Sequence, residues 1–359
     1  MDRQFKNTYN KMLIILTAGL GDFIEAIRVL ESIRKKYLSA KITLLVSDRF
    51  YSYVKNCPYC DEVIPWPVLK GSAFVAGRIP EYIKIAIYLR KQKFDVAINF
   101  YEVGSGKGAF LLNLLFKIIS PGLSIGRNTN NLANFFDKKV EDDYTMHKSQ
   151  ADYYIEIAKL LGIDTIEKFP NFWFIKNGEI SIPEKRTVVG FGIGSDRKTR
   201  LWTEEYFADV IKYVRDKYNA YSILLGGKND KEIAEKILSF SSKEEILDLT
   251  GKTDIEDLIK IIAKMTFVIS VNSAVMHIAA NSKIPTIGLI GPGELDRDRP
   301  NGEENKIFLV QKNVGCNPCN HYECPLNNKR CMIEIKPDDV IQLIEKIKIP
   351  LNPPLIKGE

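Results

Sequence analysis

The chain alternates apolar, strand-like runs with amphipathic, helix-like stretches, and it does so twice. From Met12 to Ile163, short apolar runs such as 95–100 alternate with helical patterns. The periodicity lapses over 170–183, and a second alternation starts at Thr187. Alternation of this kind is typical of parallel α/β domains, whose strands are joined by crossover helices. The sequence therefore predicts an α/β fold with two Rossmann-like domains.

The two series of expected elements define the expected domains. The expected strands lie at 12–16, 41–46, 95–100, 188–193, 222–225, 267–271 and 286–290. The expected helices lie at 80–91, 109–119, 149–161, 203–217, 229–240, 255–264, 273–281 and 337–346. We expect an N-terminal domain over 1–170, a C-terminal domain over 171–335, a closing helix over 336–348 and a tail over 349–359. Two such domains imply a cleft between them.

Length and composition exclude several classes of protein. At 359 residues, with 45% hydrophobic and 27% charged residues, the chain is typical of a globular protein of about two domains. No apolar run reaches the roughly 18 residues that a membrane span needs. Residues 1–11 are polar and lack the pattern of a secretory signal. We therefore expect a cytoplasmic protein.

The net charge of +6 is unevenly distributed. Residues 1–170 contain 24 Lys and Arg against 18 Asp and Glu, whereas the remainder contains 27 of each. Basic segments such as 34–36 and 90–93 favour an anionic partner, for example a membrane surface or a phosphorylated acceptor. Ordinary solvated helix faces are the alternative explanation.

Asp22 stands where the first expected strand gives way to a helix. The turn glycines Gly19 and Gly21 and the amphipathic stretch that follows place its carboxylate at the helix N-terminus, beside free backbone N–H groups. Such a carboxylate can act as a general base, and an Asp that only caps the helix is the alternative. Ligands of parallel sheets bind outside the carboxyl ends of the strands. The loops at 18–22 and 101–107 both occupy that position.

Two strand-to-helix loops of the second half have the character of phosphate-binding loops. The loop at 192–200 combines small residues, which let backbone N–H groups approach phosphate oxygens, with several cations. The loop at 272–277 opens a helix, whose first-turn N–H groups and dipole favour an anion. A solvated basic loop and a structural histidine are the alternatives. The residues concerned are Gly194, Ser195, Arg200, Asn272, Ser273, Ala274 and His277.

Four cysteines close to the C-terminal end form a further candidate site. Cys316, Cys319, Cys324 and Cys331 can supply thiolates for a zinc ion or an iron–sulfur cluster, although their spacing matches no standard zinc finger. Reduced thiols or a disulfide are the alternatives. A metal there would be structural, because the segment lies past the last expected strands of the sheet.

Three further motifs are weaker than they first look. The Gly-rich runs at 104–108 and 250–253 lack the earlier glycine of a nucleoside-triphosphate loop. Residues 253–256 are expected to form a helix capping box instead. Cys57 and Cys60 precede a short expected strand and do not start a helix, so we expect them to pack and not to act as a redox dithiol.

In this order, the loops resemble glycosyltransferase family 9, the ADP-heptose:lipopolysaccharide heptosyltransferases. The resemblance covers nearly the whole chain: segment 14–22 with its Gly-Asp turn, segment 58–64, the loop 194–202, and 272–277 followed by 285–292. The cysteine-containing segment also resembles a tail that many members carry.

The resemblance implies a GT-B fold and the inverting transfer of a sugar from a nucleotide diphosphate, with ADP-heptose as the expected donor. Asp22 matches the catalytic base that takes the acceptor proton, and Gly21 and Lys107 fall on the acceptor side, in the N-terminal domain. The C-terminal domain would bind the donor. The residues implied for the donor are Gly194, Ser195, Arg200, Gly226, Gly227, Glu232, Asn272, Ser273, Ala274 and His277.

The implied chemistry requires no cofactor, because cations and helix N-termini can stabilise the leaving diphosphate. The implied partners are a nucleotide-diphosphate sugar, a lipid-linked saccharide acceptor of the lipopolysaccharide core or a related glycolipid, and the inner face of the cytoplasmic membrane as a peripheral contact. The chain lacks a nucleic-acid reading motif.

Several positions depart from the family pattern. Asn272 replaces the usual Asp, Ala274 the usual Gly, and Arg200 a Lys, while Gly293 and Glu294 stand where Thr-Asp is common. Other functions therefore stay open: a non-catalytic nucleotide-sugar-binding scaffold, a GT-B enzyme with a different nucleotide sugar, a GT-B epimerase or hydrolase, and a metal- or nucleic-acid-binding module.

Overall fold

The structure is a computed structural model that describes residues 8–68, 76–143, 146–170, 172, 182, 186–241, 245–319 and 321–349. The chain divides into two compact units, Met1–Trp173 and Phe174–Glu359. Most of the stretch 170–183, where the periodicity lapses, and nearly all of the expected tail 349–359 lie outside the described residues.

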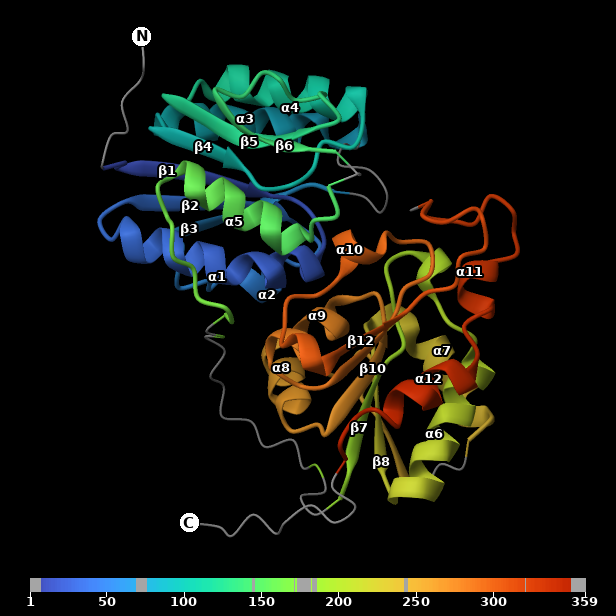
Figure 1. Ribbon diagram of the computed structural model, residues 1–359. Helices are drawn as coiled ribbons and strands as arrows, with labels where there is room; N and C mark the ends of the chain where they lie inside the picture. Colours follow the sequence, from blue (N-terminus) through green and yellow to red (C-terminus); the bar gives the residue numbers. More distant parts are fainter. Residues whose placement is uncertain are drawn as a thin grey trace, which may run out of the picture. The chain divides into compact units, whose positions relative to one another are not determined.

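The N-terminal unit contains one parallel sheet with the strand order β3-β2-β1-β4-β5-β6. Its strands are β1 (Lys11–Leu16), β2 (Lys41–Ser47), β3 (Glu62–Trp66), β4 (Val96–Asn99), β5 (Leu123–Thr129) and β6 (Lys138–Asp142). Its helices are α1 (Leu20–Lys36), α2 (Tyr51–Val54), η1 (Ala76–Arg78), α3 (Ile79–Gln92), α4 (Gly106–Ile119) and α5 (Gln150–Leu160). Helices α3 and α4 cover one face of the sheet, and α1, α2 and α5 cover the other (Figure 1).

Burial on both faces explains the composition of the central strands. In β1 every residue after Lys11 is buried, and the run is continuously apolar, as expected where helices cover both faces of a parallel sheet. One core cluster joins β1, β2 and β4 to α3 and α4. Because β1 lies between β2 and β4, the residues that follow β1 emerge at the middle of the sheet.

The C-terminal unit repeats the same topology, with the strand order β12-β11-β10-β7-β8-β9. Its strands are β7 (Val188–Gly192), β8 (Tyr221–Leu225), β9 (Ile246–Asp248), β10 (Phe267–Val271), β11 (Thr286–Leu289) and β12 (Ile307–Val310). Its longer helices are α6 (Glu204–Tyr218), α7 (Lys231–Ser239), α8 (Ile255–Ala263), α9 (Ala274–Asn281) and α12 (Pro337–Ile344). Its short helices are η2 (Lys198–Arg200), η3 (Lys228–Asp230), α10 (Leu295–Asp298), η5 (Glu304–Lys306) and α11 (Arg330–Ile333).

Counted from the first strand of each unit, both sheets have the order 3-2-1-4-5-6, that of the doubly wound Rossmann fold. The prediction of two Rossmann-like halves is thus confirmed. All the expected strands and helices are present to within a few residues, whereas β5, β6, β9 and β12 were not expected. Among the described helices, none has the length and apolar character needed to cross a membrane.

Candidate active site

Asp22 lies at the third position of α1, directly after β1. The α1 helix begins at Leu20, and the Gly19 N–H donates to Asp22 Oδ2 over 3.0 Å. The carboxylate therefore caps the helix and also lies at the positive end of its dipole. The two alternatives considered for Asp22, cap and chemical group, are compatible in one side chain.

The second carboxylate oxygen of Asp22 faces a buried tyrosine. Tyr154 of α5 places its hydroxyl 3.5 Å from Asp22 Oδ1, and its ring stacks on Phe100 with centroids 5.5 Å apart. Burial raises the pKa of Tyr154 well above its ordinary value, and the neighbouring Asp22 charge raises it further. Tyr154 therefore stays a neutral hydroxyl that can donate to the carboxylate.

Asp22 occupies the position in its sheet where the chain changes direction. Strands β1 and β4 are neighbours, but their following helices, α1 and α4, pack on opposite faces (Figure 1). Ligands of such sheets bind in the crevice that this divergence opens. Gly21 lies in the first turn of α1, and Lys107 is exposed in the first turn of α4, where the Ser105 side chain caps the helix. Both expected acceptor-side residues thus follow the two diverging strands.

The C-terminal unit has the equivalent position between β7 and β10. These strands are neighbours, and the loops that follow them touch: Ser195 Oγ donates to the Asn272 carbonyl oxygen over 3.4 Å. Ser273 is the N-cap residue of α9 and its hydroxyl lies 3.2 Å from that of Ser270. Ala274 and His277 lie in the first turn of the same helix. The structure therefore brings together the two loops that the sequence singled out for phosphate.

Arg200 and Asn272 lie on either side of an aspartate that the sequence did not single out. Arg200 Nη2 is 3.4 Å from Asp298 Oδ2. That oxygen and Asn272 Nδ2 lie 1.8 and 3.5 Å from the position that a Cβ on Gly293 would take, so a larger residue there would displace the Asp298 carboxylate. Asn272 is 3% exposed. Among the described residues, Arg200 Nε and Asn272 Nδ2 are buried donors without a hydrogen-bond acceptor. A bound anion would supply one, because buried donors are seldom left unpaired.

Asp230 organises the glycine loops after β7 and β8. The Gly227 N–H donates to Asp230 Oδ2 over 2.7 Å, and a Cβ on Gly194 would lie 1.9 Å from the same oxygen. The space beside Gly194 is therefore occupied by a carboxylate. Glu232, by contrast, is largely exposed on α7 and pairs with Lys236 at 3.3 Å.

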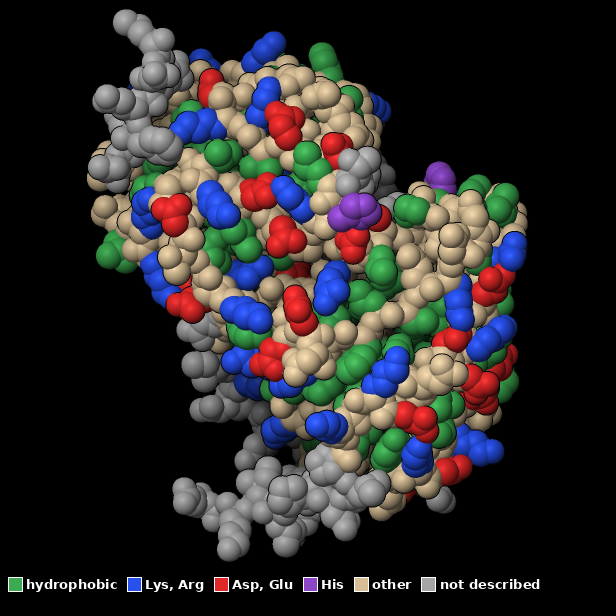
Figure 2. Space-filling model, in the orientation of Figure 1, with side chains coloured by type: hydrophobic (Ala, Val, Ile, Leu, Met, Phe, Trp, Pro, Cys, Tyr) green, Lys and Arg blue, Asp and Glu red, His purple; other side chains and the backbone are tan. Residues whose placement is uncertain are grey.

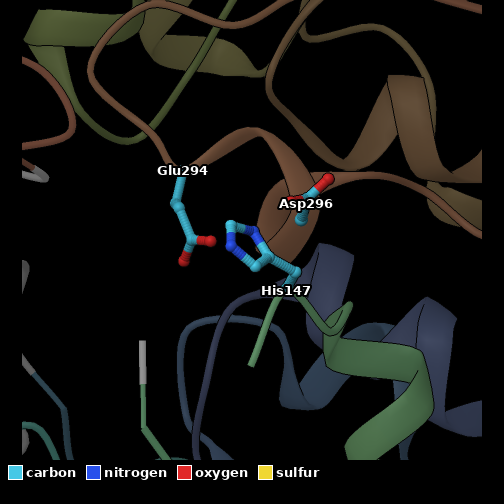
Figure 3. A group of neighbouring side chains, drawn as sticks. All are labelled: His147, Glu294 and Asp296. Carbon is cyan, nitrogen blue, oxygen red and sulfur yellow. The ribbon is translucent and has the colours of Figure 1, made fainter. Parts of the chain in front are cut away.

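Glu294, which with Gly293 departs from the usual family pattern, lies in the loop before α10, and Asp296 lies in α10 itself (Figure 3). Burial raises the pKa of Glu294, while Arg297, 3.3 Å away, lowers it. His147, also labelled in Figure 3, belongs to the N-terminal unit. Glu294 thus holds the start of α10, the helix that ends with Asp298.

The cysteine segment does not form a closed ligand set. Among the described residues, no three of its sulfur atoms lie within 4.8 Å of one another. Burial, and then the three other thiols, raise the pKa of Cys331 to about 11. The prediction of a zinc or iron–sulfur site therefore has no support in this geometry, because such a site requires several ligand atoms close together. Cys57 is buried before β3, as expected.

The cysteine segment instead packs against the loop at 192–200 and against the loop that contains Gly293. Thr199 of η2 donates to the His321 carbonyl oxygen over 2.6 Å, and the Cys319 N–H donates to the Pro292 carbonyl oxygen over 2.9 Å. Lys198 and Glu323 form an exposed ion pair at 2.9 Å. These contacts hold both the turn that contains Arg200 and the loop that contains Gly293. The sequence did not predict them.

One local prediction was wrong, and three residues were missed. The cap of α8 is Asp254, whose carboxylate accepts from the Asp257 N–H, so the helix is capped one residue later than the box expected at 253–256 required. Asp230 could have been found, since an Asp three residues after Gly227 repeats the pattern of Gly19 and Asp22. Tyr154 and Asp298 have no such local signal.

Known proteins resemble this chain in sequence and in fold. The sequence profile of glycosyltransferase family 9 (heptosyltransferase) matches residues 82–330. The chain belongs to this family. A lipooligosaccharide heptosyltransferase 2 of Campylobacter jejuni is 26% identical over 95% of this chain and its own full length. The lipopolysaccharide heptosyltransferase 2 of Escherichia coli K12 is 23% identical over 92% of this chain and 97% of its own.

Solved structures share the fold. A family 9 glycosyltransferase from Veillonella parvula superimposes with a TM-score of 0.73 at 20% identity, covering 95% of this chain and 98% of its own. The E. coli heptosyltransferase WaaC with ADP gives a TM-score of 0.67 at 19% identity, covering 94% and 99%. The expected GT-B fold is confirmed, and this family 9 chain is a glycosyltransferase.

Proposed function

We propose that this family 9 enzyme transfers a heptose from ADP-heptose to a lipid-linked saccharide of the lipopolysaccharide core or a related glycolipid, with inversion at the anomeric carbon. The observation that carries the proposal is a pair of buried donor atoms, Arg200 Nε and Asn272 Nδ2, for which the described part of the chain offers no acceptor. They lie where two loops meet at the carboxyl ends of β7 and β10. Heptosyltransferases are the full-length relatives of the chain.

The donor diphosphate would bind between these loops. Arg200 would contribute a charged, bidentate contact, and the first turn of α9, with Ser273 and Ala274, would contribute N–H groups and the positive end of its dipole. Gly194 and Ser195 belong to the same phosphate loop as Arg200, and His277 of α9 would contact the phosphates or the nucleotide. Gly226 and Gly227 would lie near the nucleoside. Glu232 has less support, because its side chain is exposed on α7.

Asp22 would be the general base. The acceptor hydroxyl oxygen forms the new bond to the anomeric carbon, the bond from that carbon to the diphosphate breaks, and the electron pair leaves with ADP. The hydroxyl proton passes to Asp22, whose carboxylate the Gly19 N–H holds in place. Arg200 and the α9 N-terminus would stabilise the charge that develops on the diphosphate. The reaction thus needs no metal or cofactor, and any ion at the cysteines would be structural.

Replacing Asp22 by Asn tests the base, and the chain offers a matched control. Asp152 caps α5 in the same way, since the Ser149 N–H donates to its carboxylate over 2.9 Å. Both Asp22→Asn and Asp152→Asn keep a side-chain oxygen that can accept from the N-cap N–H and lose only the negative charge in the first turn, at a cost of about 0.3–1 kcal/mol. Only Asp22→Asn should abolish turnover, by a factor of 100 or more, while ADP binding measured by calorimetry stays unchanged.

The outcomes separate the alternatives. Equal turnover of both variants would refute the role of Asp22. A wild-type protein that binds ADP but transfers no sugar to any lipid-linked saccharide would be a scaffold. Preference for UDP or GDP in the same titration would leave the fold unchanged and assign another nucleotide sugar.

A further inference from the structure

Helix α3 carries apolar side chains on its outer surface as well as its inner one. Ile79, Ile83 and Ile87 are 44%, 54% and 48% exposed, and they follow one another at four-residue spacing along one side of the helix. The buried stripe of α3 is a different set, Tyr82, Ala86 and Leu89. A surface helix normally confines its apolar residues to the core side, so the outer isoleucines need another explanation.

Helix α4 has the same feature. Phe110 and Leu114 are 67% and 45% exposed one turn apart, while Ala109, Leu115 and Phe116 face the core. The two helices pack together on one face of the sheet (Figure 1), and Arg90 Nη1 of α3 donates to the Ile118 carbonyl oxygen of α4 over 2.6 Å. Their outer residues therefore belong to one region, here called the α3/α4 surface: Ile79, Ile83, Ile87, Phe110 and Leu114.

The charged side chains of helices α3 and α4 are predominantly basic. The exposed lysines of the two helices are Lys84, Lys91, Lys107 and Lys117, each within one turn of an exposed apolar residue. Pro80, Ile83, Lys84, Ile87, Tyr88 and Lys91 line a shallow groove. The two helices contain a single acidic residue, Glu81, which pairs with Arg78 at 2.6 Å. Figure 2 shows basic and hydrophobic side chains at this end of the unit, with acidic side chains among them.

We propose that the α3/α4 surface docks the protein on a bilayer that contains anionic phospholipids. The apolar side chains would enter the interface between headgroups and acyl chains, and the lysines would extend to the phosphates. A second copy fits less well, because a two-fold interface places the same patch on both sides and would set lysines against lysines. The purpose of this contact rests on the proposed function, whose acceptor is linked to a lipid. Binding to the bilayer itself does not depend on sugar transfer.

The test is flotation of the purified full chain with vesicles of phosphatidylcholine, alone or mixed with phosphatidylglycerol. We expect binding to the mixed vesicles that weakens as salt is raised. Lys84→Gln and Lys91→Gln should each reduce the partition coefficient about five-fold, and Ile83→Ser and Phe110→Ser about ten-fold or more each.

Matched controls change equally exposed residues of the C-terminal unit. Phe240, 55% exposed, is the control for Phe110, and the exposed Lys212 and Lys264 are the controls for the lysines. These variants should bind vesicles as the wild type does. All variants should melt at the wild-type temperature and bind ADP equally, which separates failure of this proposal from failure of the proposed donor site.

Three results would overturn the proposal: no binding of the wild type to mixed vesicles, equal binding to neutral vesicles, or loss of binding in the controls to the same extent. A concentration-dependent dimer in analytical ultracentrifugation that the Phe110→Ser change abolishes would also overturn it, by assigning the surface to a second copy.

Discussion

Replacing Arg200 by Met should weaken the binding of ADP. The size of the loss in affinity can be estimated from the surroundings of the Arg200 side chain. Arg200 is 17% exposed and pairs with Asp298 at 3.4 Å, while its Nε has no acceptor among the described residues. A hydrogen bond between charged groups contributes roughly 1.5–3 kcal/mol. Losing the contact to the diphosphate should therefore raise the Kd of ADP about ten- to 150-fold.

Lys198 provides the control within the same turn of η2. Its side chain is 68% exposed and pairs with Glu323 in solvent, so Lys198→Met should change the Kd less than about two-fold. Arg200→Lys should fall between the two, because it keeps the charge but loses the planar, two-pronged geometry.

The assay is calorimetric titration with ADP, supported by kcat/KM for sugar transfer and by thermal melting to confirm folding. An Arg200→Met protein that binds ADP within two-fold of the wild type would refute the assignment. The assignment would also be refuted if Lys198→Met lost as much affinity for ADP as Arg200→Met, because the loss would then reflect the positive charge of the loop and not a specific contact.

Two further predictions concern buried groups. Arg127 is fully buried, pairs with Asp142 at 2.7 Å and lies 4.0 Å from the centre of the Tyr153 ring. Because Arg127→Met leaves Asp142 without its cation, it should lower the free energy of unfolding, measured in urea, by about 3–5 kcal/mol. A loss below about 1 kcal/mol would contradict this. Because burial raises the pKa of Cys331 to about 11 and backbone N–H groups lower that of Cys324, iodoacetamide should modify Cys324 well before Cys331 in peptide mapping, and equal rates would contradict the assignment. The same shift predicts a loss of stability as the pH rises from about 9 towards 11, because the unfolded thiol ionises first.

The elements were predictable where local sequence decides them. The apolar runs of β1, β2, β7 and β10 read directly as buried strands, because both faces of a doubly wound sheet are covered. The position of Asp22 at the start of α1 followed from its neighbours alone, since glycines and an amphipathic stretch mark a helix start wherever it packs. The loops could be placed at the carboxyl ends of the strands because each of them directly follows an expected strand along the chain.

The missed strands depended on contacts between distant residues. The sequence of β5 includes Arg127 and Asn128, which look like surface residues, yet both are buried. Arg127 is neutralised by Asp142 of β6, fifteen residues away, and Asn128 donates to Glu141 over 2.6 Å. Burial of polar groups is tolerated only when such partners are in place, and nothing within β5 announces them.

The candidate site divides in the same way. Asp22, Arg200 and Asn272 were recognisable from their loops, because residue type and position at a strand end are local properties. Tyr154, 132 residues from Asp22, and Asp298, 98 residues from Arg200, were not. Sheet pairing and helix packing bring these partners together, and periodicity says which side of a helix is buried but not which distant side chain it meets.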